Sequence, residues 1–269
     1  MPIVIRNPAV SGYFYPEKPE ELAGQIESFL ENCTLKPFQE NAKKPRALIL
    51  PHAGYLYSGP IAAAGFSTLL NYADQYDDIV VIGPSHRVYF DGIGLFSGDY
   101  FQTPLGNIPI NKENNQKLIA GFSAQYQNDA HSKEHSIEVM LPFLQKILKK
   151  EFSLTPILCT KVNPVIIGEM ISKFLENERT LIIASSDLSH YKDYYNARVT
   201  DRETSNLILS MDYNQITENM TCGRAAVRGL LVAAQKEKMH IDLVDLRNSA
   251  DIVQADYDKV VGYGSFLFY

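Results

Sequence analysis

The chain has 269 residues, of which 45% are hydrophobic and 21% charged, as is typical of a globular protein with a buried core. Its net charge is −6 and its lysines and arginines are scattered, which argues against nucleic-acid binding. The absence of a long apolar run argues against a membrane span or a signal peptide. The 3 widely spaced cysteines argue against a disulfide framework, so a cytoplasmic protein with reduced thiols is expected.

In the first half of the chain, apolar periodicity predicts alternating helices and strands. No repeat or Gly/Ser-rich linker interrupts the sequence, so a single domain over residues 1–269 is expected, and the polar stretch 39–46 is interpreted as a short connection. The predicted elements are a helix that follows Pro19, a strand at 47–50, a helix at 61–70, a strand at 78–82 and an irregular β region at 91–110.

The second half continues this alternation. The predicted elements are a helix at 111–120, a helix with an apolar face from 137 to 148, a strand at 154–158, a helix capped by Asn163 that ends near 176, a strand at 181–184, helices at 197–210 and 223–237, and strands at 241–247 and 260–268. Apolar strands that alternate with helices predict an α/β fold. A central, mostly parallel or mixed sheet would be flanked by helices on both faces.

Three apolar strands each end in a turn that carries a histidine. His52, His86 and His190 follow the strands at 47–50, 78–82 and 181–184. In open α/β sheets, ligands bind outside the carboxyl ends of the strands, where loops distant in sequence converge. Each histidine alone is typical of an ordinary polar turn, but three of the six in equivalent places indicate a shared site.

Cys222 lies just before the predicted helix at 223–237. A helix N-terminus stabilises a thiolate and would lower the pKa of this thiol, although a small residue that caps a buried helix end explains the position equally well. Two imidazoles and one thiolate suit iron, copper or zinc rather than magnesium or calcium. We therefore expect His52, His86 and Cys222 to bind a transition metal, with a coordination position left open for substrate or oxygen.

Other polar residues are candidates for a role around this metal. His135 could polarise or protonate a bound group, and Glu138, three residues later on the same predicted helix, could orient it. Asp187 could orient a histidine ring, and His190 could act as a general base. The remaining histidines and cysteines are assigned to solvent (His131 and His240) and to packing (Cys33 and Cys159).

Several sequence stretches together resemble the Memo family, whose prokaryotic members are called AmmeMemoRadiSam system protein B. They run nearly from end to end, and their order makes the resemblance specific. The stretches are Pro8–Tyr15, Pro51–Gly59, Gly83–His86, Glu134–Glu138 with Leu141–Pro142, Ser185–His190, Cys222–Arg224, Arg247–Asp251 and Val261–Tyr263.

The resemblance implies a fold similar to that of class III extradiol dioxygenases, in which two histidines and a glutamate hold Fe(II). Carried over by motif, His52, His86 and Cys222 would be the metal ligands. His135 and His190 would line the pocket, with His190 nearest to the acid/base role. Cys222 stands where the dioxygenases have a carboxylate, and a thiolate donates more charge and can itself be oxidised. The family name also suggests a functional link to radical SAM and AMMECR1-like proteins.

Two classes of function, and a weaker third, follow from these residues. The first is a metal-binding redox protein, with non-haem iron or copper in a dioxygenase-like site that acts on an unknown small molecule. The second is a non-catalytic module that sequesters metal or binds a peptide in the same pocket. The third is zinc-dependent hydrolysis, because zinc accepts the same ligands.

Overall fold

Four almost wholly apolar segments form the centre of the sheet. They are β2 (Ala47–Leu50), β3 (Asp78–Gly83), β8 (Ser153–Thr160) and β9 (Thr180–Ser185). These strands are parallel and lie in the order β2-β9-β3-β8. Strands buried on both faces have nearly continuous hydrophobic sequences, which explains runs such as Ile79–Ile82.

Antiparallel strands extend this centre on both sides. β12 (Val260–Phe268) pairs antiparallel with β2, and it also pairs antiparallel with β10 (His190–Lys192) and β11 (Ile241–Asn248). On the other side, β4 (Gly92–Leu95) pairs antiparallel with β8, and β7 (Gln125–Tyr126) pairs with β4. A separate small sheet contains β1 (Ile5–Arg6), β5 (Tyr100–Thr103) and β6 (Gly106–Pro109).

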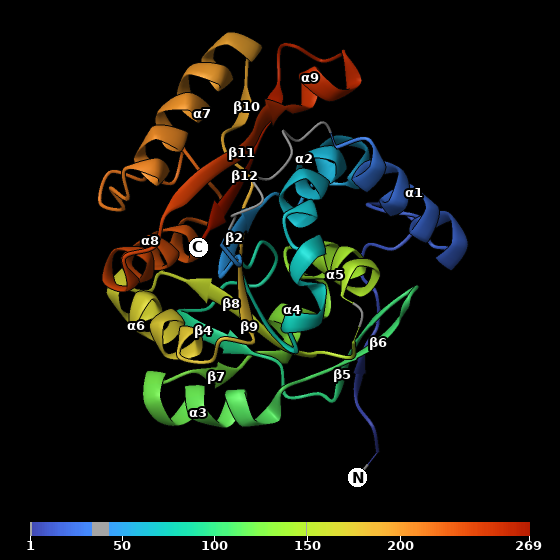
Figure 1. Ribbon diagram of the computed structural model, residues 1–269, viewed down its shortest axis with the longest axis vertical. Coiled ribbons are helices and arrows are strands. Elements are labelled where there is room, and N and C mark those ends of the chain that lie inside the picture. Colours follow the sequence, from blue (N-terminus) through green and yellow to red (C-terminus); the bar gives the residue numbers. More distant parts are fainter. Residues whose placement is uncertain (1, 34–42, 149) are drawn as a thin grey trace.

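Helices cover both faces of the large sheet (Figure 1). One face packs against α6 (Pro164–Leu175) and α8 (Arg224–Glu237), and the other against α1 (Pro19–Glu31), α2 (Tyr55–Ser67) and α5 (Leu141–Ile147). The other helical segments are α3 (Lys112–Phe122), α4 (Asn128–Ser132), α7 (Tyr194–Leu209), α9 (Ser249–Val253), η1 (Leu70–Gln75) and η2 (Glu138–Met140).

Successive side chains of each central strand point to opposite faces of the sheet, and this divides the core into two layers. In β2, Leu48 and Leu50 contribute to the layer beneath α1, α2 and α5, whereas Ala47 and Ile49 contribute to the layer beneath α6 and α8. This alternation is the expected consequence of successive side chains pointing to opposite faces of a strand. The predicted fold class, an α/β fold with a mixed sheet covered on both faces, is confirmed.

The computed structural model describes residues 2–33, 43–148 and 150–269, so the interpretation of 39–46 as a connection falls partly outside the described residues. Two predicted helices differ from the structure. The helix expected at 61–70 is α2, which begins earlier, at Tyr55, because the backbone N–H of Tyr55 donates to the carbonyl of Phe14 and fixes the chain there. The helix expected from 137 to 148 is divided between η2 and α5. Among the described residues, no helix is long and apolar enough to span a membrane.

Candidate metal centre

Side chains from three distant segments meet beyond the carboxyl ends of the central strands. His52 follows β2, His86 follows β3, and Cys222 lies just before α8. Their ligand atoms all lie within 4.8 Å of one another, and Nε2 of His52 is 3.3 Å from Sγ of Cys222. The structure therefore brings together the three residues that the sequence predicts as metal ligands.

The His52 ring is fixed with one nitrogen free for a ligand. Its Nδ1 lies 2.7 Å from the hydroxyl oxygen of Ser185, and that hydroxyl donates its own proton to the carbonyl of Ser136. The Ser185 oxygen must therefore accept from Nδ1–H, which leaves the lone pair on Nε2. The backbone N–H of His52 also donates to Oδ1 of Asp187, at 2.7 Å, so the whole residue is held.

Glu134 plays the same orienting role for His86. Its Oε1 lies 2.9 Å from Nδ1 of His86, and its Oε2 accepts the backbone N–H of the same residue. Burial raises the pKa of Glu134, but hydrogen bonds from His86 and from the backbone of Ser136 outweigh burial and lower this pKa to about 2. An ionised carboxylate can only accept, so the His86 lone pair lies on Nε2.

Cys222 is held by the turn that follows β9. Its N–H and the Thr221 hydroxyl both donate to the carbonyl of Asp187, and the N–H of Gly223 donates to the Ser186 hydroxyl at 2.7 Å. A Cβ on Gly223 would lie 2.4 Å from the carbonyl oxygen of Ser185, so only glycine allows this close approach.

The prediction that Cys222 is a low-pKa thiolate is wrong for the protein without a cation. Burial raises the pKa of this thiol to about 12, and the charge of Asp187 adds to the effect. The helix N-terminus does not compensate, because removal from water disfavours the charged form more strongly. A bound cation would therefore have to displace the thiol proton.

The donor set fits a transition metal. Burial and the neighbouring rings of His86 and His135 lower the pKa of His52 well below its usual value, so this imidazole is neutral, as a metal ligand must be. Nitrogen and sulfur ligands of one tetrahedral ion lie roughly 3.5 Å apart, given metal–nitrogen and metal–sulfur bonds of about 2.0–2.3 Å. The observed 3.3 Å between His52 and Cys222 is close to that separation.

His135 lies in the same cluster, but Glu138 does not orient it as predicted. The His135 ring stacks on the His86 ring, with centroids 4.7 Å apart, and its Nδ1 is 3.2 Å from Oε1 of Glu134. Burial lowers the pKa of His135 to about 4. Glu138 instead accepts from the side chains of Arg6 and Tyr15 and from the N–H groups of Ala9 and Val10.

Glu134 is the site residue that sequence reasoning missed. Ligand atoms of His86, Glu134 and His135 also lie within 4.8 Å of one another, but the Glu134 carboxylate already accepts from the backbone of His86, His135 and Ser136. It therefore orients the His86 ring, whereas Nδ1 of His135 makes no hydrogen bond to any described residue. The signal that could have revealed it is its position immediately before His135, within the Glu134–Glu138 stretch.

His190 lies next to Asp187, and both line the same cavity as His135. Its Nδ1 is 2.9 Å from the carbonyl of Leu188, and its Nε2 is 4.0 Å from Oδ2 of Asp187. A register shift between His190 and Lys192, together with a left-handed backbone at Tyr191 (φ 57°), turns this segment out of the regular β10–β12 pairing. Such bulges often redirect a side chain at a functional site.

A cavity of about 970 Å³ opens over these residues. Of the residues predicted for the site, all but Glu138 line it, namely His52, His86, His135, Asp187, His190 and Cys222. The rim carries exposed aromatic rings, among them Tyr13 and Tyr191, while Tyr263 is buried at the wall. This volume is at the upper end of the range of small-molecule sites.

Two histidines and two cysteines are predicted to lie outside the site, the histidines in solvent and the cysteines packed in the protein. His240 is exposed and Cys159 is buried in the core, as predicted. Cys33 packs partly buried against the other layer of the core. The assignment of His131 to solvent is wrong, because this ring is 1% exposed among Phe96 and Phe101, and its Nε2 donates to the carbonyl of Gly94.

Comparisons with known proteins agree with this fold. A solved structure of an uncharacterized protein from Escherichia coli K12 aligns with a TM-score of 0.56 at 14% identity, over 83% of this chain and 99% of that one. MEMO1 family proteins of Thermoplasma volcanium and Aquifex aeolicus are 35% and 34% identical, over 98% of this chain and 98% and 99% of theirs. Residues 6–267 match the family described as Memo-like protein. The chain therefore belongs to the Memo-like protein family.

Proposed function

We propose that this protein binds non-haem iron or copper through His52, His86 and Cys222 and uses it in redox chemistry on a small organic substrate. The observation that supports this proposal most directly is the 3.3 Å separation between Nε2 of His52 and Sγ of Cys222. Both imidazoles have their Nδ1–H engaged by an acceptor, which leaves both Nε2 lone pairs available to one ion.

The three ligands have distinct roles in this proposal. The bound metal would act as a Lewis acid and exchange electrons with the substrate. His52 and His86 would hold it as neutral donors. Cys222 would add a negative charge and a soft donor once its proton has left, which favours iron, copper or zinc over magnesium and calcium. Three protein ligands leave room for substrate on the cavity side.

His190 would move a proton to or from the substrate. Its Nδ1–H donates to the carbonyl of Leu188, so Nε2 carries the lone pair on the side of Asp187 and the cavity. Burial raises the pKa of Asp187 and the positive charge of a protonated His190 opposes that rise. The 4.0 Å separation between Nε2 of His190 and Oδ2 of Asp187 supports Asp187 as the carboxylate that orients the His190 ring.

Anaerobic reconstitution followed by metal quantification would test the proposal. Protein purified without chelator would be loaded separately with Fe(II), Cu(I) and Zn(II), and the excess metal removed. We expect about one iron or copper per chain. Change in the oxidation state of that metal on exposure to oxygen would then be followed spectroscopically. Failure of both iron and copper to bind would contradict the proposal, and retention of zinc alone would favour hydrolysis.

A non-catalytic binding module is the second candidate. The width of the cavity and the exposed rings of Tyr13 (90%) and Tyr191 (73%) at its rim favour it, because an open aromatic rim suits a peptide as well as a small molecule. Metal that binds stoichiometrically but never changes oxidation state in the presence of oxygen and reductant would favour this candidate.

A further inference from the structure

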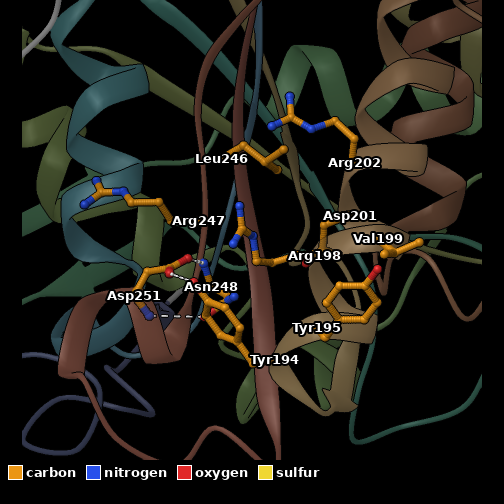
Figure 2. Close-up of a pocket in the computed structure, with 10 residues that line it drawn as sticks. All are labelled: Tyr194, Tyr195, Arg198, Val199, Asp201, Arg202, Leu246, Arg247, Asn248 and Asp251. Atoms are coloured by element: carbon orange, nitrogen blue, oxygen red, sulfur yellow. Dashed lines mark hydrogen bonds between the residues drawn. The ribbon is translucent and has the colours of Figure 1, made fainter.

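A second cavity, of about 690 Å³, lies between α7, β11 and the start of α9, and it shares no lining residue with the metal centre (Figure 2). Its walls come from α7 on one side and from Leu246 and Asn248 of β11 on the other. The volume is within the usual range of small-molecule sites. No part of the proposed metal function requires this cavity.

Two arginines of α7 face this cavity without an acidic partner. Arg198 and Arg202 are four residues apart, so they lie on one face of the helix, and Figure 2 shows both guanidinium groups extending toward Leu246. In the described part of the chain, neither forms an ion pair with a carboxylate within 4.0 Å. Like charges at this spacing destabilise a helix slightly, and a bound anion would relieve that repulsion.

Arg247 provides a contrast within the same cavity wall. Its guanidinium contacts both carboxylate oxygens of Asp245, and in Figure 2 it points away from Arg198. Its charge is therefore neutralised by the protein itself. Arg198 contacts Tyr194, with its Cζ 5.5 Å from the centroid of that ring and with a side-chain hydrogen bond to the same residue, but among the described residues it has no carboxylate partner of its own. The two α7 arginines thus retain their capacity to form bidentate contacts with an anion.

The two carboxylates that line the cavity are engaged by donors from the protein. Asp251 accepts from the Tyr194 hydroxyl at 2.7 Å and from the backbone N–H of Asn248. Asp201 is 3% exposed and accepts the N–H of Ser189. Burial raises the pKa of Asp201 to about 6.

The floor of the cavity contains an unsatisfied donor. Asn248 is 1% exposed, and its Oδ1 accepts from the N–H groups of Ala250 and Asp251, whereas its Nδ2 has no hydrogen-bond partner. Figure 2 shows this amide on the side that faces Arg198. A buried donor without a partner is costly, and such groups often mark a site where a ligand or an ion completes the hydrogen bonding.

We infer that this cavity, here called the α7–β11 pocket, binds a small organic anion. A phosphate or carboxylate group would be held between the guanidinium groups of Arg198 and Arg202. The Nδ2 amide group of Asn248, on the floor of the cavity, would add its partial positive charge. Leu246, Val199 and the exposed ring of Tyr195 offer apolar contact for the organic part of the ligand. Both anionic groups accept the same bidentate contacts from arginine, so the pocket is assigned to that shared chemistry.

Calorimetric titration of the full-length protein would test this inference. The probes are phenyl phosphate, benzoate and phenol, which share a ring and differ in charge. We expect saturable binding of phenyl phosphate, benzoate or both, at concentrations up to about 10 mM, and none of phenol. Replacing either arginine, as Arg198→Gln or Arg202→Gln, should weaken binding about tenfold, as loss of a charge-assisted contact predicts.

Three controls make the outcome decisive. The double variant Lys117→Gln/Lys236→Gln removes two exposed helical charges elsewhere and should bind the probe as the parent does. Cys222→Ser should also bind it normally, which separates this pocket from the metal centre. Because Arg198 and Arg202 are exposed, the unfolding temperatures of the two arginine variants should stay within about 2 °C of that of the parent protein. Equal affinity in parent and arginine variants, or no saturable binding of either anion, would overturn the inference.

Discussion

The sulfur of Cys222 lies 3.3 Å from Nε2 of His52, although 170 residues separate them along the chain. The turn after β9 explains this proximity, because Asp187 holds both partners. Its carboxylate accepts the N–H of His52, and its carbonyl accepts the N–H of Cys222. The two residues are therefore positioned by one rigid turn before any ion is bound.

Replacing Cys222 with serine should weaken metal binding by about tenfold or more, because a hydroxyl is a much poorer donor than a thiolate for iron or copper. Competition with a chelator of known affinity would measure the change. Cys33→Ser is a suitable control, since it removes a partly buried thiol outside the site. Equal metal affinity in Cys222→Ser and the parent would show that this sulfur is not a ligand.

Glu134→Gln should reduce metal affinity by about tenfold to a hundredfold, the usual effect of losing the partner of a ligating histidine. The glutamine keeps the shape of the side chain but no longer offers two acceptor oxygens to the ring and the backbone of His86. The measurement is again chelator competition. Glu169→Gln, on the surface of α6, is the matched control, and an unchanged affinity in Glu134→Gln would remove Glu134 from the site.

His190→Gln should leave the metal content unchanged and abolish turnover, because His190 is proposed to move a proton and not to bind the metal. Metal quantification gives the first result. Oxygen consumption by the iron-loaded protein with catechol as a probe substrate gives the second, relative to the parent. Loss of metal along with activity would instead make His190 a ligand.

The buried His131 should make the fold less stable as the pH falls. Burial lowers its pKa to about 4 in the folded protein, against about 6.5 when unfolded, so the unfolded state takes up the proton first. Stability linked to this group is complete above pH 6.5 and is lost between about pH 6.5 and 4. The loss at pH 5 is about 2 kcal/mol.

Denaturant titrations of the parent and His131→Gln at pH 7.5 and pH 5 would measure this effect. The variant can still donate to the carbonyl of Gly94, so its stability should depend less steeply on pH than that of the parent, by about 2 kcal/mol over this interval. The comparison isolates His131, because His52 and His135 remain in both proteins. Identical pH dependence in the two proteins would contradict the assignment.

Much of the fold could be predicted because the central strands are almost wholly apolar and some helices have clear side-chain caps. Asn163, for example, accepts the N–H of Val165 at the start of α6, as its sequence position indicates. The convergence of His52, His86 and Cys222 could also be predicted, since the ends of parallel strands meet at one edge of a sheet.

The errors share a physical cause, which is contact between segments distant in sequence. Glu138 was expected to face His135, but the N-terminal residues Arg6 and Tyr15 bind it instead. The buried environment of His131 likewise depends on Phe96 and Phe101. The pKa of Cys222 depends on its burial and on Asp187, neither of which is visible in the local sequence around α8.

X-ray absorption spectroscopy of the iron- or copper-loaded protein tests the central claim most directly, because it reports the atoms bonded to the metal. We expect a shell that includes one sulfur at about 2.3 Å and two imidazole nitrogens at about 2.0–2.1 Å. The sulfur contribution should vanish in Cys222→Ser. A first shell of nitrogen and oxygen alone in the parent protein would contradict the proposed metal centre.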